Sequence, residues 1–262
     1  MSNSKYLKTI MIDRVNGEEI IEVEDVTIEE ARLNVYLNDQ KIISMMCIPK
    51  DQKAHAIGFL MSENVITHIN DLESIEVSED GLKVDIKAAV DKDSLQNLYK
   101  EKTLVSGCGG GITGNVAGSL QIPFNQTNFV ISPKIISDEV KKFYADSELY
   151  RLTGCVHKAM LFLEDTSTVT AEDIGRHNAI DKAVGKCKLE GLDTTKAVLF
   201  VSGRLSSEMV VKAVMHRIPI VVSRTAPTYL GVQTANKHGI TLIGFARGKK
   251  MNIYTHSGRV HG

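Results

Sequence analysis

The chain has 262 residues, of which 43% are hydrophobic and 24% are charged, and its formal net charge is −1. This composition is typical of a globular protein with one large domain or two modest ones, and the balanced charge does not indicate nucleic-acid binding. No apolar run reaches the ~20 residues of a membrane-spanning helix, and the N-terminus lacks the apolar core of a secretory signal. We therefore expect a cytoplasmic protein without membrane or nucleic-acid partners.

Residues 1–103 are predicted to form a small domain of mixed α+β structure. Four segments alternate between apolar and polar residues, as half-buried strands do, at 19–23, 31–37, 74–78 and 82–86. A continuous apolar run at 42–48 indicates a buried strand, and the pattern at 52–66 predicts a helix. His55 on this helix is interpreted as a packed or solvent-facing histidine rather than as a ligand.

Residues 104–120 are predicted to form a flexible glycine-rich loop that carries Cys108. Glycine lifts the Cβ restriction on the backbone and leaves the neighbouring thiol without bulky shielding. An accessible sulfur suits thiol chemistry with large partners, because a thiolate must reach its target. A linker that happens to hold a cysteine is the alternative interpretation. The stretch contains a G-x-G-x-x-G pattern, but glycine and proline follow it instead of a helix, which argues against a dinucleotide site.

The four cysteines are Cys47, Cys108, Cys155 and Cys187, and none forms a C-x-x-C pair. Their spacing shows neither a zinc framework nor an evident disulfide scaffold, so a reducing compartment is the simplest setting. Cys47 lies in an apolar run and Cys187 in a predicted helix, and both are expected to serve as small packing residues. Only Cys108 has a sequence context that indicates reactivity.

Residues 121–262 alternate between helix and strand patterns. Helices are predicted at 137–150, 176–189, 206–215 and 227–238. Strands are predicted at 159–163, 168–174, 197–201, 218–223, 240–245 and 251–255. This alternation is typical of a layered α/β domain with a largely parallel segment.

Three arginines directly follow three of the predicted buried strands: Arg204, Arg224 and Arg247. Open α/β sheets bind ligands at the carboxyl ends of their strands, where helix N-termini also supply N–H donors for anions. The planar guanidinium group can hold a phosphate through two hydrogen bonds. One such arginine would be interpreted as a surface loop residue, but three at equivalent positions favour a phosphate-bearing ligand. Lys249 and Lys250 extend the positive charge.

A second polar constellation lies at residues 173–182, where Arg176 and His177 begin a predicted helix. His177 and Asp181 are four residues apart on one helix face, so the carboxylate could pair with the imidazole and orient it. Acid–base chemistry and a structural network at the helix start both remain open. A third polar turn at 153–157 makes His157 a candidate for the same sheet edge.

These motifs occur together, in one order, and resemble those of the formate dehydrogenase accessory sulfurtransferase family. The runs that carry the resemblance lie at 153–157, 173–182, 202–204, 223–228 and 239–247. The resemblance implies a protein that takes persulfide sulfur from a cysteine desulfurase. The sulfur then passes to the molybdenum or tungsten bis(molybdopterin guanine dinucleotide) cofactor before the cofactor enters formate dehydrogenase. It further implies a cytidine-deaminase-like C-terminal domain and a homodimer.

The resemblance also assigns residues. The persulfide cysteine of the family corresponds to Cys108, which would be the catalytic residue. Its segment that binds the nucleotide part of the cofactor corresponds to Phe245, Ala246, Arg247, Gly248, Lys249 and Lys250. From the reasoning above, we add four further candidates for cofactor binding, namely Arg204, Arg224, Arg176 and His177.

Two departures bear on these assignments. Many members of the family carry C-x-x-C in the loop, whereas Gly111 stands at the second position here, so either Cys108 works alone or the pair is dispensable. The chain also lacks the H-x-E and P-C-x-x-C patterns of the zinc deaminases, so neither deamination nor a zinc site is expected. The alternative function is an assembly chaperone that binds the cofactor or the dehydrogenase without transferring sulfur.

Overall fold

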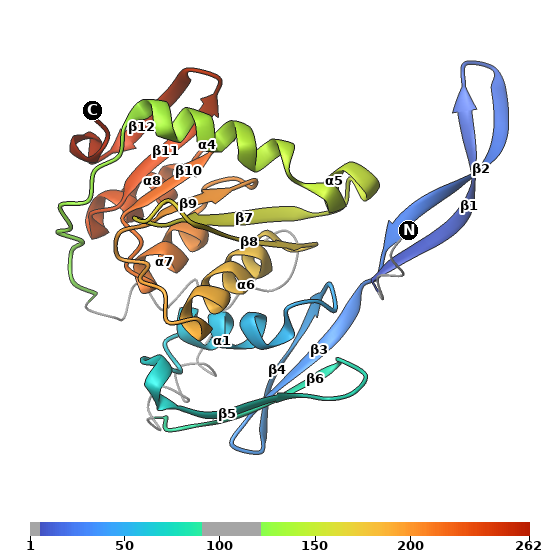
Figure 1. Cartoon of the computed structure of the whole chain (residues 1–262), viewed down its shortest axis with the longest axis horizontal. Coiled ribbons are helices and arrows are strands. Elements are labelled where there is room, and N and C mark those ends of the chain that lie inside the picture. Colours follow the sequence, from blue (N-terminus) through green and yellow to red (C-terminus); the bar gives the residue numbers. More distant parts are fainter. Residues whose placement is uncertain (1–5, 91–121) are drawn as a thin grey trace.

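A computed structural model describes residues 6–90 and 122–262, which form a body with a central sheet, a smaller sheet beside it and a projecting two-stranded arm (Figure 1). The predicted loop at 104–120, with Cys108, lies outside the described residues. In the part of the chain that is described, no helix is long and apolar enough to span a membrane.

The central sheet has six strands in the order β12-β11-β10-β9-β7-β8. Their bounds are β7 (His157–Phe162), β8 (Thr168–Asp173), β9 (Val198–Val201), β10 (Ile220–Ser223), β11 (Thr241–Arg247) and β12 (Lys250–Thr255). The parallel segment that the sequence predicted is confirmed for β9, β10 and β11, while the other neighbours pair antiparallel. Every residue of β9 and β10 is buried, as expected for strands covered on both faces.

Helices cover the two faces of this sheet (Figure 1). The helix α4 (Pro133–Ala145) packs against Val198 and Phe200 of β9, whereas the alternate residues Leu199 and Val201 face the opposite core. That second core is completed by α6 (Arg176–Leu189), α7 (Ser207–Met215) and α8 (Tyr229–His238). A short 3₁₀ turn, η2 (Ser257–Arg259), ends the fold.

The expectation of one helix over 137–150 was wrong at both ends. The helix α4 begins four residues earlier, because the Ser132 hydroxyl accepts a hydrogen bond from the Ile135 N–H and Pro133 occupies the first turn. It ends at Ala145, and a separate short helix, α5 (Glu148–Thr153), follows and closes on Gly154 in a left-handed conformation.

The smaller sheet has the order β4-β3-β6-β5, and one helix, α1 (Gln52–Ser62), lies between it and α6 (Figure 1). The bounds are β3 (Ala31–Leu37), β4 (Gln40–Cys47), β5 (Leu72–Val77) and β6 (Lys83–Ala88), with the 3₁₀ turn η1 (Ile69–Asp71) before β5. Cys47 and Cys187 are both buried, which confirms their packing role. His55 is packed, with 0% of its surface exposed.

The contact between α1 and α6 is close because each helix has a glycine at the crossing. A side chain at Gly58 would overlap the carbonyl of Asp181, and one at Gly185 would overlap the carbonyl of Ala54. Backbones can approach this closely only where neither residue carries a Cβ. The N-terminal part of the chain is therefore held against the C-terminal sheet through its helix.

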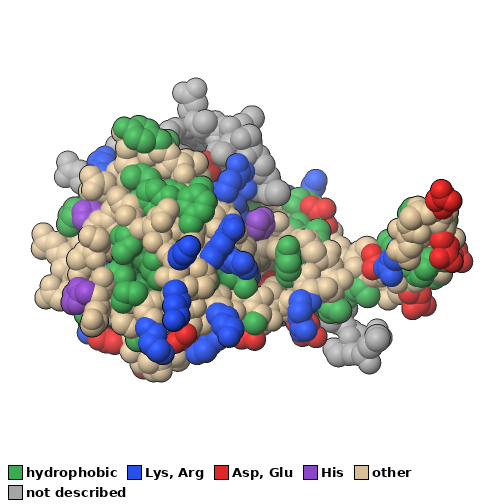
Figure 2. Space-filling model, turned by 90° about the horizontal axis from the view of Figure 1, so that it is seen from above, with side chains coloured by type: hydrophobic (Ala, Val, Ile, Leu, Met, Phe, Trp, Pro, Cys, Tyr) green, Lys and Arg blue, Asp and Glu red, His purple; other side chains and the backbone are tan. Residues whose placement is uncertain are grey.

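The arm is an antiparallel ribbon of β1 (Leu7–Asn16) and β2 (Glu19–Ile28), which turns at Gly17 with a positive φ of 65°. It extends away from the body and carries acidic side chains at its tip, whereas Lys and Arg side chains form a row across the body (Figures 1 and 2). The sequence predicted a strand at 19–23 but none at 7–16, where Ile10 and Met11 are adjacent and break the alternation. Both of these side chains are exposed.

Candidate functional site

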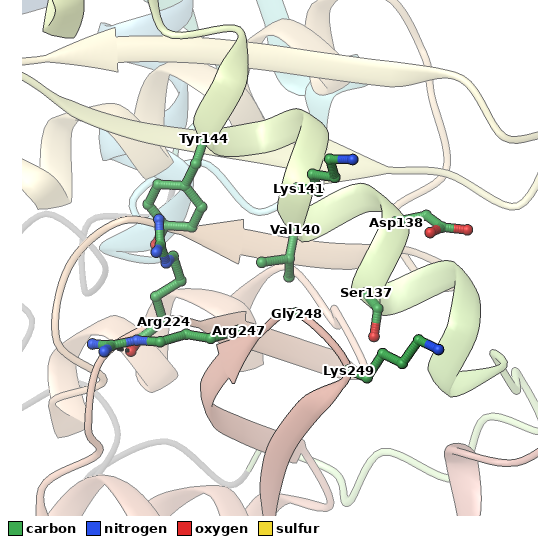
Figure 3. A pocket seen from close by; sticks show the side chains of 9 residues that line it. All are labelled: Ser137, Asp138, Val140, Lys141, Tyr144, Arg224, Arg247, Gly248 and Lys249. Carbon is green, nitrogen blue, oxygen red and sulfur yellow. Dashed lines mark hydrogen bonds between the residues drawn. The ribbon is translucent and has the colours of Figure 1, made fainter.

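A cationic cavity of about 360 Å³ lies between α4 and the carboxyl ends of β10 and β11 (Figure 3). Arg224 follows β10, Arg247 ends β11, and the turn into β12 contributes Gly248 and Lys249. One face of α4 completes the lining with Ser137, Asp138, Val140, Lys141 and Tyr144. Four cations and one carboxylate therefore line the cavity.

Arg224 is held at the wall of this cavity by Tyr144. Its guanidinium carbon lies 4.4 Å from the centre of the Tyr144 ring, which is cation–π geometry. Burial raises the pKa of the Tyr144 phenol, so the ring remains neutral at physiological pH. Arg247 lies beside it, with Nη2 3.4 Å from the carbonyl oxygen of Arg224. These contacts orient both guanidinium groups without neutralising them.

None of the four cations in this cavity forms an ion pair with a carboxylate of the described ranges 6–90 and 122–262. Surface cations near acids normally find partners, as Lys134 does with Asp138 on the same helix at 2.9 Å. Unpaired cations that line one cavity attract an anion with several oxygens, such as a phosphate or pyrophosphate.

A second cavity of about 660 Å³ adjoins the first and shares Arg224 and Tyr144 with it. Its other lining residues are Phe143, Ser147, Tyr150, Gly154, Cys155, Val156, His157, Lys158, Ile174, Ser202 and Thr225. The sequence placed His157 at this edge, and the structure confirms it. Its Nδ1 lies 3.1 Å from the Ser202 hydroxyl, and burial lowers its pKa, with the nearby charges of Arg176 and His177 adding to the effect.

Cys155 is exposed in this larger cavity, which the sequence did not indicate. Only Gly154 separates it from the end of α5 at Thr153, and its N–H donates to the Thr153 hydroxyl. The only sequence signal was its position in a polar turn before a buried strand.

Arg176 and His177 lie in the first turn of α6 and are only 8% and 6% exposed. The expected pairing of His177 with Asp181 was wrong. Asp181 instead accepts hydrogen bonds from Lys212 of α7 at 2.7 and 2.9 Å. His177 Nε2 lies 3.1 Å from Glu208 Oε2, although not in hydrogen-bond geometry. Helices that pack across the fold thus supply the partners, rather than the next turn of the same helix.

The comparisons with known proteins agree with this architecture. The sequence model of the FdhD/NarQ family matches residues 28–261. The chain belongs to this family. A sulfur carrier protein FdhD from Wolinella succinogenes is 55% identical over 257 residues, which cover 98% of this chain and 90% of that protein. A sulfur carrier protein FdhD from Bacillus subtilis is 32% identical, covering 98% and 99% of the two chains.

A solved structure also matches the whole FdhD/NarQ chain. The crystal structure of a protein from Desulfotalea psychrophila, described as a formate dehydrogenase accessory protein, superposes with a TM-score of 0.82. The two sequences are 25% identical, and the match covers 97% of this chain and 99% of the other. This likeness confirms the predicted α/β architecture with its cytidine-deaminase-like fold.

The structure separates the candidate cofactor-binding residues of this FdhD/NarQ chain into groups. Four of them, Arg224, Arg247, Gly248 and Lys249, meet in the cationic cavity. Lys250 is exposed, and its backbone lies opposite that of Arg247 in the antiparallel register of β11 and β12. Phe245 is 43% exposed with a positive φ of 52°, whereas Ala246, on the alternate face of the strand, is buried in the core.

Three other candidates lie away from that cavity. Arg204 is exposed in the connection from β9 to α7 and lines neither cavity. Arg176 and His177 occupy the buried cluster described above. The catalytic candidate Cys108 lies outside the described residues. Within residues 6–90 and 122–262, no group of three or more His, Cys, Asp and Glu side chains is arranged to hold a metal ion.

Sequence reasoning missed the contribution of α4 to the cationic cavity. Ser137, Lys141 and Tyr144 are spaced as one helix face, which adjoins the face of the buried residues Ile136 and Phe143. The polar stripe is visible in the sequence. Its position above the ends of β10 and β11 is not, because it depends on how the helix crosses the sheet.

Proposed function

We propose that this protein is a sulfurtransferase that carries sulfur for the maturation of formate dehydrogenase in the cytoplasm. In this proposal, Cys108 accepts persulfide sulfur from a cysteine desulfurase. The acceptor is the molybdenum or tungsten bis(molybdopterin guanine dinucleotide) cofactor, which the protein binds as a substrate. The names of its relatives, sulfur carrier proteins and a formate dehydrogenase accessory protein, support the general role.

The observation that carries the acceptor part of the proposal is the unpaired cationic cavity. Each arm of the acceptor contains a pyrophosphate, and the guanidinium groups of Arg224 and Arg247 can each hold a phosphate through two parallel hydrogen bonds. Lys249 and Lys141 add point charges around the same space. The adjoining larger cavity gives the rest of the arm room to extend from the phosphates.

Sulfur loading needs no external oxidant in this scheme. The Cys108 thiolate attacks the outer sulfur of the desulfurase persulfide, a new S–S bond forms, and the desulfurase cysteine leaves as a thiolate. The number of S–S bonds is unchanged, so the step is a transfer. A single cysteine is sufficient for it, which fits the presence of Gly111 where many members of the family carry a second cysteine.

Mass spectrometry after incubation with desulfurase and cysteine tests the loading step. We expect the mass of one added sulfur atom, located on Cys108, and its loss on reduction. The variant Cys108→Ala should remain folded, bind nucleotide and fail to support formate dehydrogenase activity in a deletion strain. Cys155→Ala, which removes the exposed cysteine of the larger cavity, should load like the wild type.

Guanosine diphosphate, as a fragment of the acceptor, tests the cationic cavity. A charge-assisted contact contributes on the order of 1.5–3 kcal/mol, so Arg247→Ala should weaken binding about tenfold or more. Added salt should weaken wild-type binding, since the charges are exposed. Arg32→Ala, an exposed arginine on the smaller sheet, is the matched control. Equal affinity of Arg247→Ala and Arg32→Ala in calorimetry would remove the acceptor from this cavity.

An assembly chaperone that holds the cofactor without transferring sulfur is the second candidate. The absence of a second loop cysteine favours it, because such a protein needs no thiol chemistry. Full formate dehydrogenase activity with Cys108→Ala would establish this alternative. We also propose that the protein acts as a homodimer together with formate dehydrogenase and the desulfurase, and sedimentation of the purified chain tests the dimer.

A further inference from the structure

The N-termini of α6 and α7 meet at a buried cluster of polar side chains. Arg176 and His177 come from the first turn of α6, and Ser206 and Glu208 come from the start of α7. Five buried side-chain atoms of this cluster have no hydrogen-bond partner among the described residues: Arg176 Nε, His177 Nδ1 and Nε2, Ser206 Oγ and Glu208 Oε2. Buried polar groups in folded proteins are nearly always paired, so these unpaired atoms, which include N–H and O–H groups of Arg176 and Ser206, call for an explanation.

On α6 and α7, the lack of partners is confined to this cluster, because the buried lysines of the same two helices are paired with carboxylates. Lys182 of α6 lies 2.6 Å from Asp173, and Lys212 of α7 lies 2.7 Å from Asp181. Arg176, by contrast, has no carboxylate partner within the described part of the chain. Its unpaired Nε is thus a local feature of the α6 and α7 N-termini.

Both helix N-termini are open toward the cluster. Gly175 precedes α6 and cannot cap it with a side chain, and the Ser206 hydroxyl makes no capping hydrogen bond to α7. The first N–H groups of a helix lack intrahelical partners and carry the positive end of its dipole. The helices have 14 and 9 residues, and their first turns meet where His177 Nε2 of α6 lies 3.1 Å from Glu208 Oε2 of α7. Helix N-termini of this kind bind anions.

Neighbouring contacts place the cluster next to the larger cavity. The aliphatic part of Arg176 lies along Gly203, where a Cβ would come within 3.1 Å of its Cδ. Gly203 follows Ser202, and Ser202 contacts His157 in the wall of that cavity. Burial lowers the pKa of His157, and the charges of Arg176 and His177 add to the effect.

We propose that the joined N-termini of α6 and α7 form a binding site for a small, soft monoanion, and that its ligand is a sulfur anion of the perthiolate or hydrosulfide type. The choice of a perthiolate, the ionised form of the transferred sulfur, rests on the proposed sulfur-carrier function. A dianionic phosphate fits poorly, because the Glu208 carboxylate belongs to the cluster. A buried site favours a weakly hydrated, polarisable anion, since such an anion loses little when it leaves water.

The consequence for function is that the site would keep the outer sulfur ionised. Two helix dipoles, the Arg176 guanidinium and the hydroxyl of Ser206 all stabilise the anion relative to its protonated form. An ionised perthiolate is a stronger nucleophile than its protonated form, as a thiolate is stronger than a thiol, so ionisation would favour its delivery to the acceptor. Arg176 and His177 would then bind the sulfur anion rather than the nucleotide part of the cofactor.

Crystals of the full chain soaked in sodium iodide test the site, because iodide is a soft monoanion that anomalous scattering locates. We expect iodide in contact with Arg176 Nε, His177 Nδ1 and Ser206 Oγ. Calorimetry with sodium hydrosulfide should show binding that iodide competes with and inorganic phosphate does not. Iodide found only at the surface would overturn the site, and preferential binding of phosphate at the cluster would overturn the sulfur assignment.

The variant Arg176→Met keeps the length of the side chain and removes its charge. It should weaken hydrosulfide binding by about tenfold or more, as expected for a charged contact. Arg217→Met changes an exposed arginine at the opposite end of α7 and should bind like the wild type. If Arg176→Met does not fold, Ser206→Ala removes one donor and should still weaken binding several-fold. Equal binding by the folded variant and the wild type would contradict the proposal.

The same samples separate this inference from the proposed function. A wild-type protein that loads sulfur on Cys108 but binds neither iodide nor hydrosulfide at the cluster would overturn the anion site and leave the carrier function intact. A second arm uses a small alkyl persulfide in place of hydrosulfide. Binding of the persulfide with tighter affinity than hydrosulfide would assign the site to the perthiolate, whereas the reverse order would assign it to free sulfide.

Discussion

Two groups of cations in this protein differ in how they are neutralised. At the joint between α1, α6 and α7, Lys182 and Lys212 are 0% and 3% exposed at their side chains, and each is paired with a carboxylate. In the cationic cavity, Arg224, Arg247 and Lys249 are exposed, and none is paired within the described ranges. Paired buried charge serves the fold, and unpaired exposed charge is available to a ligand.

The buried joint shows why its charges must be matched. Lys182 Nζ donates to the carbonyl of Ile48 as well as to Asp173, and Asp173 accepts the N–H groups of Ile48 and Gly175. Removing charges from water costs free energy that only close partners and further hydrogen bonds offset. This network ties the end of the smaller sheet to the start of α6, so its integrity determines how the two parts of the chain dock.

The largest expected effect comes from breaking a buried pair. Lys182→Met leaves Asp173 charged and unpaired, which should lower the free energy of unfolding by about 3–5 kcal/mol. Adding Asp173→Asn removes the uncompensated charge and should recover part of this loss. Urea unfolding of both variants at neutral pH measures the two values. A loss below ~1 kcal/mol in the single variant would show that the pair does not hold the joint together.

A smaller effect is expected where the helix backbones touch. Gly58→Ala places a methyl group against the carbonyl of Asp181, so α1 and α6 must separate. Such overpacking costs about 1–3 kcal/mol. Gly258→Ala, where a Cβ meets no neighbouring atom, is the matched control and should change stability by less than ~0.5 kcal/mol. Similar midpoints for the two variants in thermal unfolding would argue against a close helix crossing.

The buried joint should also lose stability in acid. Burial lowers the pKa of His55 from 6.5 to about 4, and the charge of Lys182 adds to the effect. The unfolded chain therefore binds a proton near pH 6.5 that the folded chain does not bind until near pH 4, so stability is full above pH 6.5 and falls as the pH is lowered. Linkage puts the contribution of His55 on the order of 2 kcal/mol at pH 5.

Urea unfolding at pH 7 and pH 5 measures this dependence. His55→Leu should show a shallower loss than the wild type, whereas His261→Leu, near the exposed C-terminus, should not. Some dependence should remain, because burial also lowers the pKa of His216. Identical slopes for His55→Leu and the wild type would contradict the assignment.

The smallest expected effect on stability is that of the ligand-facing arginines. Arg247→Ala removes an exposed side chain whose hydrogen bond to the Arg224 carbonyl is long, so the free energy of unfolding should change by less than ~0.5 kcal/mol. Arg259→Ala is the instructive counterpart, because Arg259 donates to the carbonyls of Asn125 and Gly239 at 2.6 and 2.8 Å. It should cost about 1–3 kcal/mol. Equal losses would mean that Arg247 serves the fold as Arg259 does.

Much of the cationic cavity could be predicted from sequence alone. The apolar runs before Arg224 and Arg247 indicated buried strands, and residues that follow parallel strands meet at one sheet edge. Arg204 follows a strand in the same way but lines neither cavity. Its strand lies farther from β11 in the sheet, and the direction of a connecting loop is not encoded in the strand pattern.

The sequence by itself therefore determined the order of helices and strands in residues 121–262 apart from α5, the packing roles of Cys47 and Cys187, and two of the three arginines at the site. These features depend on local periodicity and on hydrophobicity, which neighbouring residues carry. The tertiary structure alone decided that Tyr144 stacks on Arg224, that His177 faces Glu208 rather than Asp181, and that Cys155 opens into a cavity. Each of these contacts joins elements that are distant in the chain, so it depends on how the layers cross and not on any pattern within one element.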